Sequence, residues 1–557
     1  EYTPRHPPLQ AQPLREVRDR ATRAANPMPF DLERNGDLLV AILADIEAAE
    51  DLPPDDLSRI LRRHPLPDGT LLSKPKLLRA YAQLCERDQR PIDTQLVRRL
   101  RVKPTRTISG VAPVTVLTKP HPCPGECIFC PSVEGMPKSY LPDEPGAMRA
   151  VAHGFDPYSQ TSSRVEAMSR LGHPVDKIEL LILGGSWSCY PEDYQDWFVR
   201  RCLDALNHKE SETLETAQQL NETASCRNVG LVIETRPDLV TPDEVVRLRR
   251  QGVTKVQLGV QSLDDNILAL NRRGHTVAHT RQAVRLLRLA GFKIQVHWMP
   301  NLLGATPDGD LEDFRRLWDD PAIRPDELKI YPTSLLAGTE LHRLYELGEY
   351  EPYSEETLVD LLVECKMLIP QYCRLNRLMR DIPAPNIIAG VKRSNLRQVI
   401  QQRLAQTGQA CRCIRCREIR GRPVDSASLV SQRIDYDTGA TKEHFLSYAT
   451  EEGLLVGFLR LSLPQMSPPV AELEGHALIR EVHVYGPALQ LGAQQEKVAQ
   501  HIGVGTRLIS DARRIAREEG YERIAVIAAV GTRPYYSGHG FALGELYMAG
   551  FTEPTSA

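Results

Sequence analysis

The chain has 557 residues, more than one hydrophobic core can organise, and its length favours roughly three or four domains. Hydrophobic residues make up 41% of it and charged residues 25%, as in ordinary globular proteins. No apolar run approaches the ~18 residues of a membrane span and no secretory signal is recognisable, so we expect a cytoplasmic protein with no membrane partner. The net charge of −3 does not by itself suggest a nucleic-acid partner.

Basic residues are nevertheless unevenly distributed. Leu96–Arg106, LVRRLRVKPTR, contains five basic residues and no acidic one. Four further acid-free basic runs are Ser58–His64, Ser73–Arg79, Cys373–Arg380 and Gly390–Arg397. Any one run is compatible with a solvated helix face. Together, in a slightly acidic chain, they indicate a segregated positive surface that suits a phosphate backbone.

The predicted elements form four blocks. Residues 1–100 begin Pro-rich and continue with amphipathic helical spacing. Residues 101–395 alternate short β-branched strands with helices, which predicts an α/β fold with a parallel sheet or a partial (βα) barrel. A Cys- and Arg-rich connector spans 396–425, and residues 426–557 combine strands, a glycine-rich turn and a helix.

Within the second block the alternation is regular. The predicted strands are Ile178–Gly185, Val229–Thr235, Lys255–Ser262, Phe292–Pro300 and Glu327–Thr333. Between them lie helical patterns such as TPDEVVRLRRQG, which Thr241 can cap and Gly252 can end. The polar residues Glu234, Gln261 and Lys329 lie at strand ends, where barrel active sites form, and are candidate substrate contacts.

Cys123, Cys127 and Cys130 lie in HPCPGECIFCPS, a C-x3-C-x2-C spacing expected by chance on the order of 0.005 times in such a chain. Three thiolates can hold an iron–sulfur cluster and leave one iron open to another ligand. A zinc site is the alternative and requires a fourth, distant ligand. The spacing resembles the radical S-adenosylmethionine (SAM) family, in which SAM chelates the open iron of a 4Fe-4S cluster. Gly184 and Gly185, which end a strand, are similar to that family's glycine motif.

A second cluster, CRCIRCRE, places Cys411, Cys413 and Cys416 in the connector. Its position between blocks favours a structural zinc site, with a second iron–sulfur cluster as the alternative. The fourth ligand stays open between Cys365, Cys373 and a nearby histidine.

The C-terminal block carries QHIGVG, Gln500–Gly505, directly before a helical pattern. Backbone N–H groups in such a turn can bind a pyrophosphate. Strand patterns at Leu478–Gly486 and Arg523–Gly531 flank it, and TRPYYSGHGF follows. This order resembles the GCN5-related acetyltransferase fold, which binds coenzyme A; a phosphate-free glycine turn is the alternative.

A radical SAM barrel, a Cys-rich connector and an acetyltransferase domain in one chain closely resemble the family of the catalytic subunit of Elongator, in its stand-alone prokaryotic form. The resemblance runs from about residue 100 to 550 and includes ETRPD, GVQS, IREVHVYG and VGTRPYY. It implies a tRNA-modifying acyltransferase that forms 5-carboxymethyluridine at the wobble uridine, with acetyl-CoA as carbon donor and SAM as radical source. A deoxyadenosyl radical would abstract hydrogen from the acetyl methyl group, and the carbon radical would add to C5 of the uracil.

The same resemblance implies the partners and the site residues. The partners are the tRNA anticodon stem-loop, which residues 1–100 help to bind, and an electron donor for the cluster; whether the chain forms a homodimer stays open. Lys177, Tyr535 and Tyr536 are the implied catalytic residues, and Lys177 and Tyr536 also contact acetyl-CoA. The remaining acetyl-CoA residues are a strand and a turn: Glu481, Val482, His483, Val484, Gln500, Gly503, Val504, Gly505 and Thr506.

Two other functions remain as alternatives. One is a protein lysine acetyltransferase with a structural iron–sulfur domain. The other is a tRNA-binding scaffold that uses acetyl-CoA as a structural ligand. A purely structural cluster is expected to have four cysteines, so the three in HPCPGECIFCPS disfavour the lysine acetyltransferase.

Overall fold

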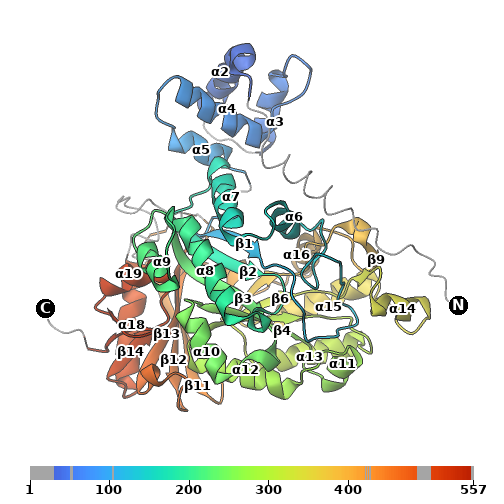
Figure 1. Cartoon of the computed structure of the whole chain (residues 1–557), viewed down its shortest axis with the longest axis vertical. Coiled ribbons are helices and arrows are strands. Elements are labelled where there is room, and N and C mark those ends of the chain that lie inside the picture. The colour runs from blue at the N-terminus through green and yellow to red at the C-terminus, as the bar shows by residue number, and fades with distance from the viewer. Residues whose placement is uncertain are drawn as a thin grey trace.

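The computed structural model describes residues 30–49, 54–102, 106–420, 422, 424–425, 428–485 and 503–553. A small helical unit projects from one end of a larger body, in which two sheets lie side by side (Figure 1). No helix in the described ranges combines the length and hydropathy that a membrane crossing requires.

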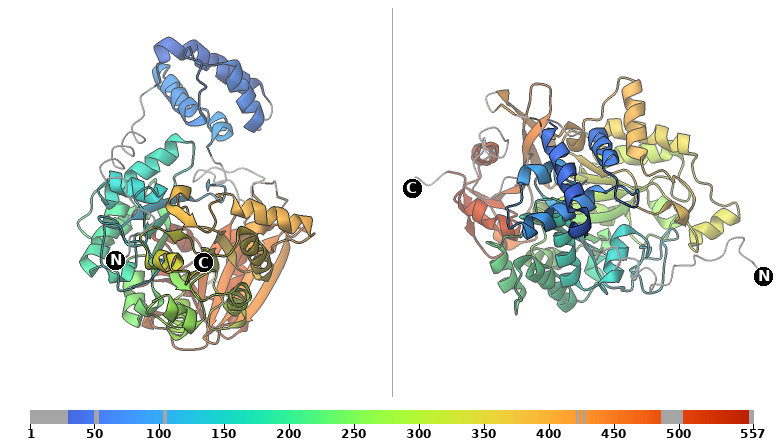
Figure 2. Two further views of the ribbon diagram at one scale, coloured as in Figure 1. Left: turned by 90° about the vertical axis from the view of Figure 1, so that its right-hand side faces the viewer. Right: turned by 90° about the horizontal axis from the view of Figure 1, so that it is seen from above.

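The projecting unit consists of the N-terminal helices. These are α2 (Leu32–Ala48), α3 (Pro54–Arg63), α4 (Lys74–Arg87) and α5 (Thr94–Leu100). Their apolar faces, including Leu39, Ile42 and Leu77, form a core separate from that of the sheets. Figure 2 shows this unit standing over the body, and α4 contacts α7 (Pro157–Arg170) beneath it. The helical character expected for this part of the chain is confirmed for the described residues.

The first sheet is a half barrel of parallel strands. In spatial order these are β1 (Ala112–Leu117), β2 (Lys177–Leu183), β3 (Arg227–Thr235), β4 (Lys255–Gln261), β5 (Lys293–Trp298), β6 (Glu327–Ile330) and β8 (Arg374–Arg377). Every neighbouring pair is parallel. The predicted partial (βα) barrel is therefore confirmed, with β1 and β8 as its two edges.

Helices follow most strands, and most of them cover the outer face of the half barrel (Figure 1). They are α6 (Pro145–Ala152), α7, α8 (Glu192–Asn207), α9 (Leu214–Asn221), α10 (Pro242–Arg250), α11 (Asp265–Leu270), α12 (Val277–Leu289), α13 (Pro307–Asp319), α14 (Glu340–Glu346) and α15 (Glu355–Leu368). As predicted, Thr241 caps α10, because its side chain accepts a hydrogen bond from Glu244 N. A two-stranded pair, β7 (Leu335–Leu336) and β9 (Ile387–Ala389), lies outside the main sheet.

The connector is partly helical. Helix α16 (Leu396–Gln406) packs against α15, and the short α17 (Ile414–Arg417) lies beside β8. The predicted limits of the connector and of the other domains stay predictions.

The second sheet has the order β10 (Val430–Asp437), β11 (Thr441–Ala449), β12 (Leu455–Pro464), β13 (His476–Val484), β14 (Arg523–Val526), β16 (Met548–Phe551) and β15 (Ala542–Leu543). Helices α18 (Val504–Glu518) and α19 (Arg533–Ser537) complete the C-terminal unit. Only β13 and β14 pair in parallel, through His476–Ile479 and Arg523–Val526. The two strands then separate, so the strand predicted for Arg523–Gly531 is shorter than expected. The C-terminal sheet domain of the predicted fold class is confirmed.

Candidate active site

One cavity of about 750 Å³ connects the half barrel to the C-terminal sheet. At the carboxyl ends of the barrel strands it is lined by the cysteine loop, including Cys123, Cys127 and Cys130. At the amino ends of the same strands it is lined by residues of the other unit: Glu481, Val482, His483, Tyr485 and Tyr536. The lumen of the half barrel is therefore continuous from the cysteines to the C-terminal sheet.

The cysteine loop lies beside two arginines that the sequence analysis did not single out. Arg273 Nη1 donates to Cys127 Sγ at 3.0 Å. The guanidinium of Arg236 occupies the space that a side chain at Gly125 would need, and its Nη1 is buried without a hydrogen-bond partner. The two guanidinium groups therefore place positive charge beside the cysteine loop. The donor set thus fits a cluster held by three thiolates, although the three sulfur atoms are not gathered within 4.8 Å of one another.

The glycine pair after β2 has backbone conformations that suit glycine. Gly184 and Gly185 have φ values of +122° and +125°. A side-chain carbon at Gly184 would lie 2.9 Å from Thr118 N and collide with the Thr118 hydroxyl, whereas Gly185 has open space and lines the cavity. The pair therefore allows the chain to turn closely against the end of β1 and to present backbone to the cavity.

The strand-end residues Glu234, Gln261 and Lys329 all line the cavity, where strand polarity placed them. Burial lowers the pKa of Lys329 to about 7, with Glu234 opposing the shift and Arg377 adding to it. Burial raises the pKa of Glu234, and Lys329 opposes that shift. Gln261 has a φ of +73°, and its Oε1 is buried without a hydrogen-bond partner. Lys329 Nζ donates to Gln257 Oε1, so among these three residues only Gln261 Oε1 is a buried polar atom without a partner.

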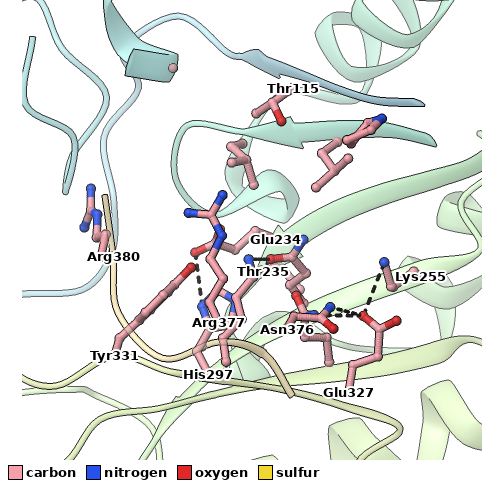
Figure 3. A pocket seen from close by; sticks show the side chains of 18 of the residues that line it. Thr115, Glu234, Thr235, Lys255, His297, Glu327, Tyr331, Asn376, Arg377 and Arg380 are labelled. Carbon is pink, nitrogen blue, oxygen red and sulfur yellow. Dashed lines mark hydrogen bonds and ion pairs between the residues drawn. The ribbon is translucent and has the colours of Figure 1, made fainter. Parts of the chain in front are cut away.

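Further lining residues come from β5 to β8 and were missed by the sequence analysis. Figure 3 shows His297, Tyr331 and Arg377 gathered around Glu234. His297 Nδ1 lies 3.7 Å from Glu234 Oε1, and burial holds the pKa of His297 well below its ordinary value. Only their strand-end positions could have suggested them, because none belongs to a spaced motif.

Nearer the C-terminal sheet, the lumen contains a second polar group. Glu327 Oε2 accepts hydrogen bonds from Asn376 Nδ2 at 2.6 Å and from Lys255 Nζ at 3.3 Å (Figure 3). Although burial alone would raise it, Lys255 and Lys293 hold the pKa of Glu327 at about 2. This group is charge-balanced within the fold.

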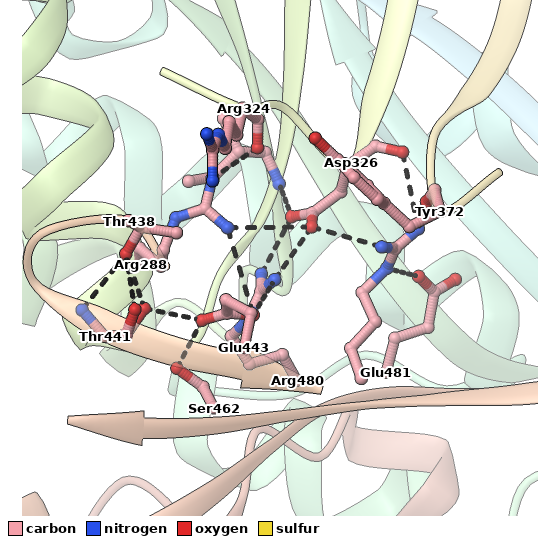
Figure 4. A network of polar contacts seen from close by, with 12 residues as sticks. Arg288, Arg324, Asp326, Tyr372, Thr438, Thr441, Glu443, Ser462, Arg480 and Glu481 are labelled. Atoms are coloured by element: carbon pink, nitrogen blue, oxygen red, sulfur yellow. Dashed lines mark hydrogen bonds and ion pairs between the residues drawn. The ribbon is translucent and has the colours of Figure 1, made fainter. Parts of the chain in front are cut away.

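A buried ion network joins the two sheets beneath the cavity (Figure 4). Asp326, before β6, is fully buried and accepts two hydrogen bonds from Arg480 of β13, at 2.7 and 2.8 Å. Arg480 also donates to Glu443 Oε2 at 2.7 Å, and Arg460 Nη1 lies 3.4 Å from Asp326 Oδ1. Burial alone would raise the pKa of Asp326. The guanidinium groups of Arg480, Arg460 and Arg288 nevertheless hold this pKa far below its ordinary value. The network fixes the position of β13 under the barrel.

On the C-terminal side, the separation of β13 from β14 frees a strand edge. Beyond Ile479, residues Glu481–His483 pair with β12, and no described residue of β14 pairs with them. Gly503, with φ +70°, begins α18, and a side-chain carbon at Gly505 would lie 2.6 Å from Tyr535 Oη and 3.8 Å from Val484. The structure therefore brings the implied backbone-pairing strand and the glycine turn together.

The two adjacent tyrosines have different environments. Tyr536 is 7% exposed and lines the cavity, whereas Tyr535 is 45% exposed and lies over the glycine turn. Of the other turn residues, Val504 is buried and Thr506 is exposed, and Gln500 lies outside the described residues. Tyr536 is thus the tyrosine that faces the lumen.

Lys177 is not brought to the cavity wall. It is the first residue of β2 and shares a face with Glu179 and Leu181, which do line the lumen. Its catalytic role stays a prediction.

The second cysteine cluster is compact. Cys411, Cys413 and Cys416 have their sulfur atoms within 4.8 Å of one another. Among the described residues, no further His, Cys, Asp or Glu atom falls within that distance of all three, and Cys365 and Cys373 lie outside the group. Three gathered thiols fit a metal ion or cluster, and the donor set does not choose between zinc and iron–sulfur.

Comparisons with known proteins agree with this arrangement. Residues 121–317 match the radical SAM superfamily, and residues 325–406 match the radical SAM C-terminal domain. The chain is 44% identical, over 80% of its length and 98% of the relative, to "tRNA uridine(34) acetyltransferase" of Dehalococcoides mccartyi. It is 37% identical to "Elongator complex protein 3" of Danio rerio, over 93% of this chain and 98% of that one.

The solved structure of archaeal Methanocaldococcus infernus Elp3 with an N-terminal deletion superposes with a TM-score of 0.71 at 39% identity, covering 80% of this chain and all of that one. The radical SAM match implies a 4Fe-4S cluster and SAM, and Cys123, Cys127 and Cys130 are the residues that fit the cluster. The chain is therefore a radical SAM enzyme that belongs to the family of Elongator complex protein 3 and the tRNA uridine(34) acetyltransferases.

Proposed function

We propose that this enzyme uses acetyl-CoA and a SAM-derived radical to form 5-carboxymethyluridine at the wobble uridine, position 34, of tRNA. The substrate, a uridine of tRNA, is inferred from the names of its relatives. The observation that carries the rest is the single cavity lined by both the cysteine loop and the freed edge of β13. A radical and an acetyl group can react only where they share a closed space.

At the upper end of the cavity, Cys123, Cys127 and Cys130 would hold the cluster. When bound, the cluster supplies the electron that cleaves SAM and gives a 5′-deoxyadenosyl radical. The unpaired Oε1 of Gln261 and the backbone at Gly185 are available to bind the polar end of SAM. Both lie at the carboxyl ends of barrel strands, beside the cysteine loop.

At the lower end, the chain would hold acetyl-CoA through backbone groups. The edge of β13 at Glu481–His483, which does not pair with β14, can pair with the amide groups of the pantetheine arm. The first N–H groups of α18, at Val504, Gly505 and Thr506, have no partner within the helix and can donate to the pyrophosphate. Tyr536 lines the lumen, and its hydroxyl can position the thioester.

The uracil ring would enter between these two ends. A uridine must leave the anticodon loop stack to reach a buried centre, as in other base-modifying enzymes. Lys329 and Glu234 offer a donor and an acceptor inside the lumen, suited to the polar edge of a pyrimidine. The surrounding protein excludes water and so protects a radical intermediate.

Isotope transfer tests the proposal. Anaerobic, iron-reconstituted and reduced protein is incubated with SAM, acetyl-CoA labelled in the methyl carbon, and tRNA with uridine or cytidine at position 34. Label in a uridine-derived nucleoside, only with uridine at that position, is the expected result. Tyr536→Phe should reduce transfer more than the matched Tyr535→Phe. Label found only on protein lysines would support the lysine acetyltransferase alternative, and acetyl-CoA binding without turnover would support the scaffold.

We further propose that Cys411, Cys413 and Cys416 hold a structural zinc ion. Their three gathered thiols on a short segment beside β8 support a role in fixing the connector. Zinc, iron and sulfide analysis of a Cys127→Ser protein, which should lack the first cluster, tests this assignment. Iron and sulfide retained in place of zinc would contradict it.

A further inference from the structure

The half barrel is open between its edge strands, and the cavity reaches both edges. Residues Pro113 and Thr115 of β1 line it on one side, and Asn376 and Arg377 of β8 line it on the other. A ligand approaching from the side therefore passes between β1 and β8 before it reaches the strand-end residues.

The arginines on the two sides of this opening differ in their partners. On the β8 side three arginines have a carboxylate: Arg374 pairs with Glu418, Arg377 with Asp381 at 2.8 Å, and Arg380 with Glu144 at 2.8 Å. A fourth, Arg415 of α17, donates to Asn376 O at 3.3 Å and has no acidic partner among the described residues. The positive charges of Arg374, Arg377 and Arg380 are therefore balanced by carboxylates within the fold.

On the β1 side three arginines line the cavity with no acidic partner among the described residues: Arg106, Arg149 of α6 and Arg164 of α7. Arg106 and Arg164 make no hydrogen bond or ion pair to a described residue, and Arg149 Nη1 donates only to Pro145 O of its own helix, at 2.7 Å. The Nε atom of Arg164 is buried and has no partner. Within the part of the chain that the structure describes, Arg106 and Arg164 therefore have no partner, and Arg149 has only a carbonyl of its own helix.

The three guanidinium groups also repel one another. Burial, Arg149 and Arg106 together lower the pKa of Arg164 to about 10. Burial and Arg106 lower the pKa of Arg149, and no carboxylate offsets either shift. Arg149 and Arg164 are half-buried, whereas Arg106 is exposed. Half-buried charges of one sign without a counter-charge destabilise a fold, so such a pair is expected where a ligand supplies the opposite charge.

We propose that Arg106, Arg149 and Arg164 bind a phosphodiester group of the RNA strand whose base enters the cavity through the open side of the half barrel. Guanidinium groups match the oxygen geometry of phosphate and hold it without reading sequence. The phosphates of coenzyme A are the other source of this chemistry. The RNA backbone is favoured because the cluster lies on α6 and α7, beneath the basic N-terminal helices, and not beside the glycine turn of α18. The inference rests on the proposed function.

The salt dependence of RNA binding tests it. Full-length protein is titrated with a uridine-containing RNA stem-loop over a range of salt concentrations. Each phosphate contact in single-stranded nucleic acid contributes about 0.7 to the slope of log K against log salt. Arg164→Gln and Arg149→Gln should each lower the slope by about that amount and weaken binding equally for loops of different sequence. Arg164→Lys, which keeps the charge, should retain most of the slope.

Arg170→Gln is the matched control. Arg170 is on the same helix as Arg164, is exposed and pairs with Glu166, so its loss should leave the slope unchanged. Because Arg164 and Arg149 make no hydrogen bond or ion pair to a described residue outside their own helices, the glutamine variants should unfold at or above the wild-type temperature.

The outcomes separate this inference from the proposed function. A wild-type protein that binds no RNA would overturn both. Wild-type binding with an unchanged slope in Arg164→Gln and Arg149→Gln would overturn only the phosphate site. If instead these variants lose affinity for free coenzyme A while RNA binding is intact, the cluster serves the cofactor and the RNA assignment is wrong.

Discussion

Asp326→Asn tests whether the buried ion network holds the two sheets together. The substitution keeps the side-chain volume and removes the charge that faces Arg480, Arg460 and Arg288. Asp326 accepts two hydrogen bonds from Arg480 and one, at 2.9 Å, from Ile294 N. An asparagine keeps one acceptor oxygen and turns an NH2 group toward donors. Removing one partner of a fully buried pair costs about 3–5 kcal/mol, and we expect a loss of that order.

The loss should appear in calorimetry as a lower unfolding temperature and as separation of the transitions of the two sheets. The control is Glu519→Gln, which breaks the exposed pair with Lys442 in the same C-terminal unit and should have little effect. The pH dependence of stability provides a second test. Since the pKa of Asp326 is lowered in the fold, its contribution to stability is present at neutral pH and is lost as the pH falls below about 4. The asparagine variant should lack this part of the acid dependence of stability. An Asp326→Asn protein that unfolds like Glu519→Gln would refute the reasoning.

Three further predictions concern single sites. Because the pKa of Lys329 falls to about 7 in the fold, the unfolded chain binds more protons than the folded one between about pH 7 and 10, and the stability of the protein should rise with pH over this range. Lys329→Met should be more stable than wild type at pH 7. Its unfolding temperature, measured in thermal melts, should no longer rise with pH over this range. Gly184→Ala should lower the free energy of unfolding by roughly 2–4 kcal/mol in denaturant titration, since it adds backbone strain and a clash with Thr118. Gly185→Ala should lower it less, because the space around Gly185 is open. Equal losses in the two variants would contradict this. Chelation, or Cys413→Ser, should release the proposed metal and lower the unfolding temperature, while Cys226→Ser, outside the cluster, should retain the metal.

Local patterns predicted much of the half barrel and part of its site. Strand polarity places Glu234, Gln261 and Lys329 at one end of a parallel sheet, and all three line the cavity. The cysteine spacing was sufficient to identify the loop that carries Cys123 to Cys130, because its members are close in sequence.

Contacts between distant segments were not predictable in the same way. Arg273 and Cys127 are 146 positions apart, and Asp326 and Arg480 are 154 apart. No periodicity or spacing relates such residues, since their meeting depends on how the barrel closes and how the second sheet docks. The different environments of Tyr535 and Tyr536 likewise depend on the short helix α19, because only Tyr536 lines the lumen.

The direction of the barrel strands has a kinetic consequence. The cysteine loop lies at their carboxyl ends and the β13 edge at their amino ends, so the lumen has two opposite ends. Under the proposed function, SAM and acetyl-CoA occupy different ends, and each can be exchanged without displacing the other. The carbon fragment then passes directly to the base in a ternary complex, and no acylated form of the enzyme has to be stored between two half-reactions.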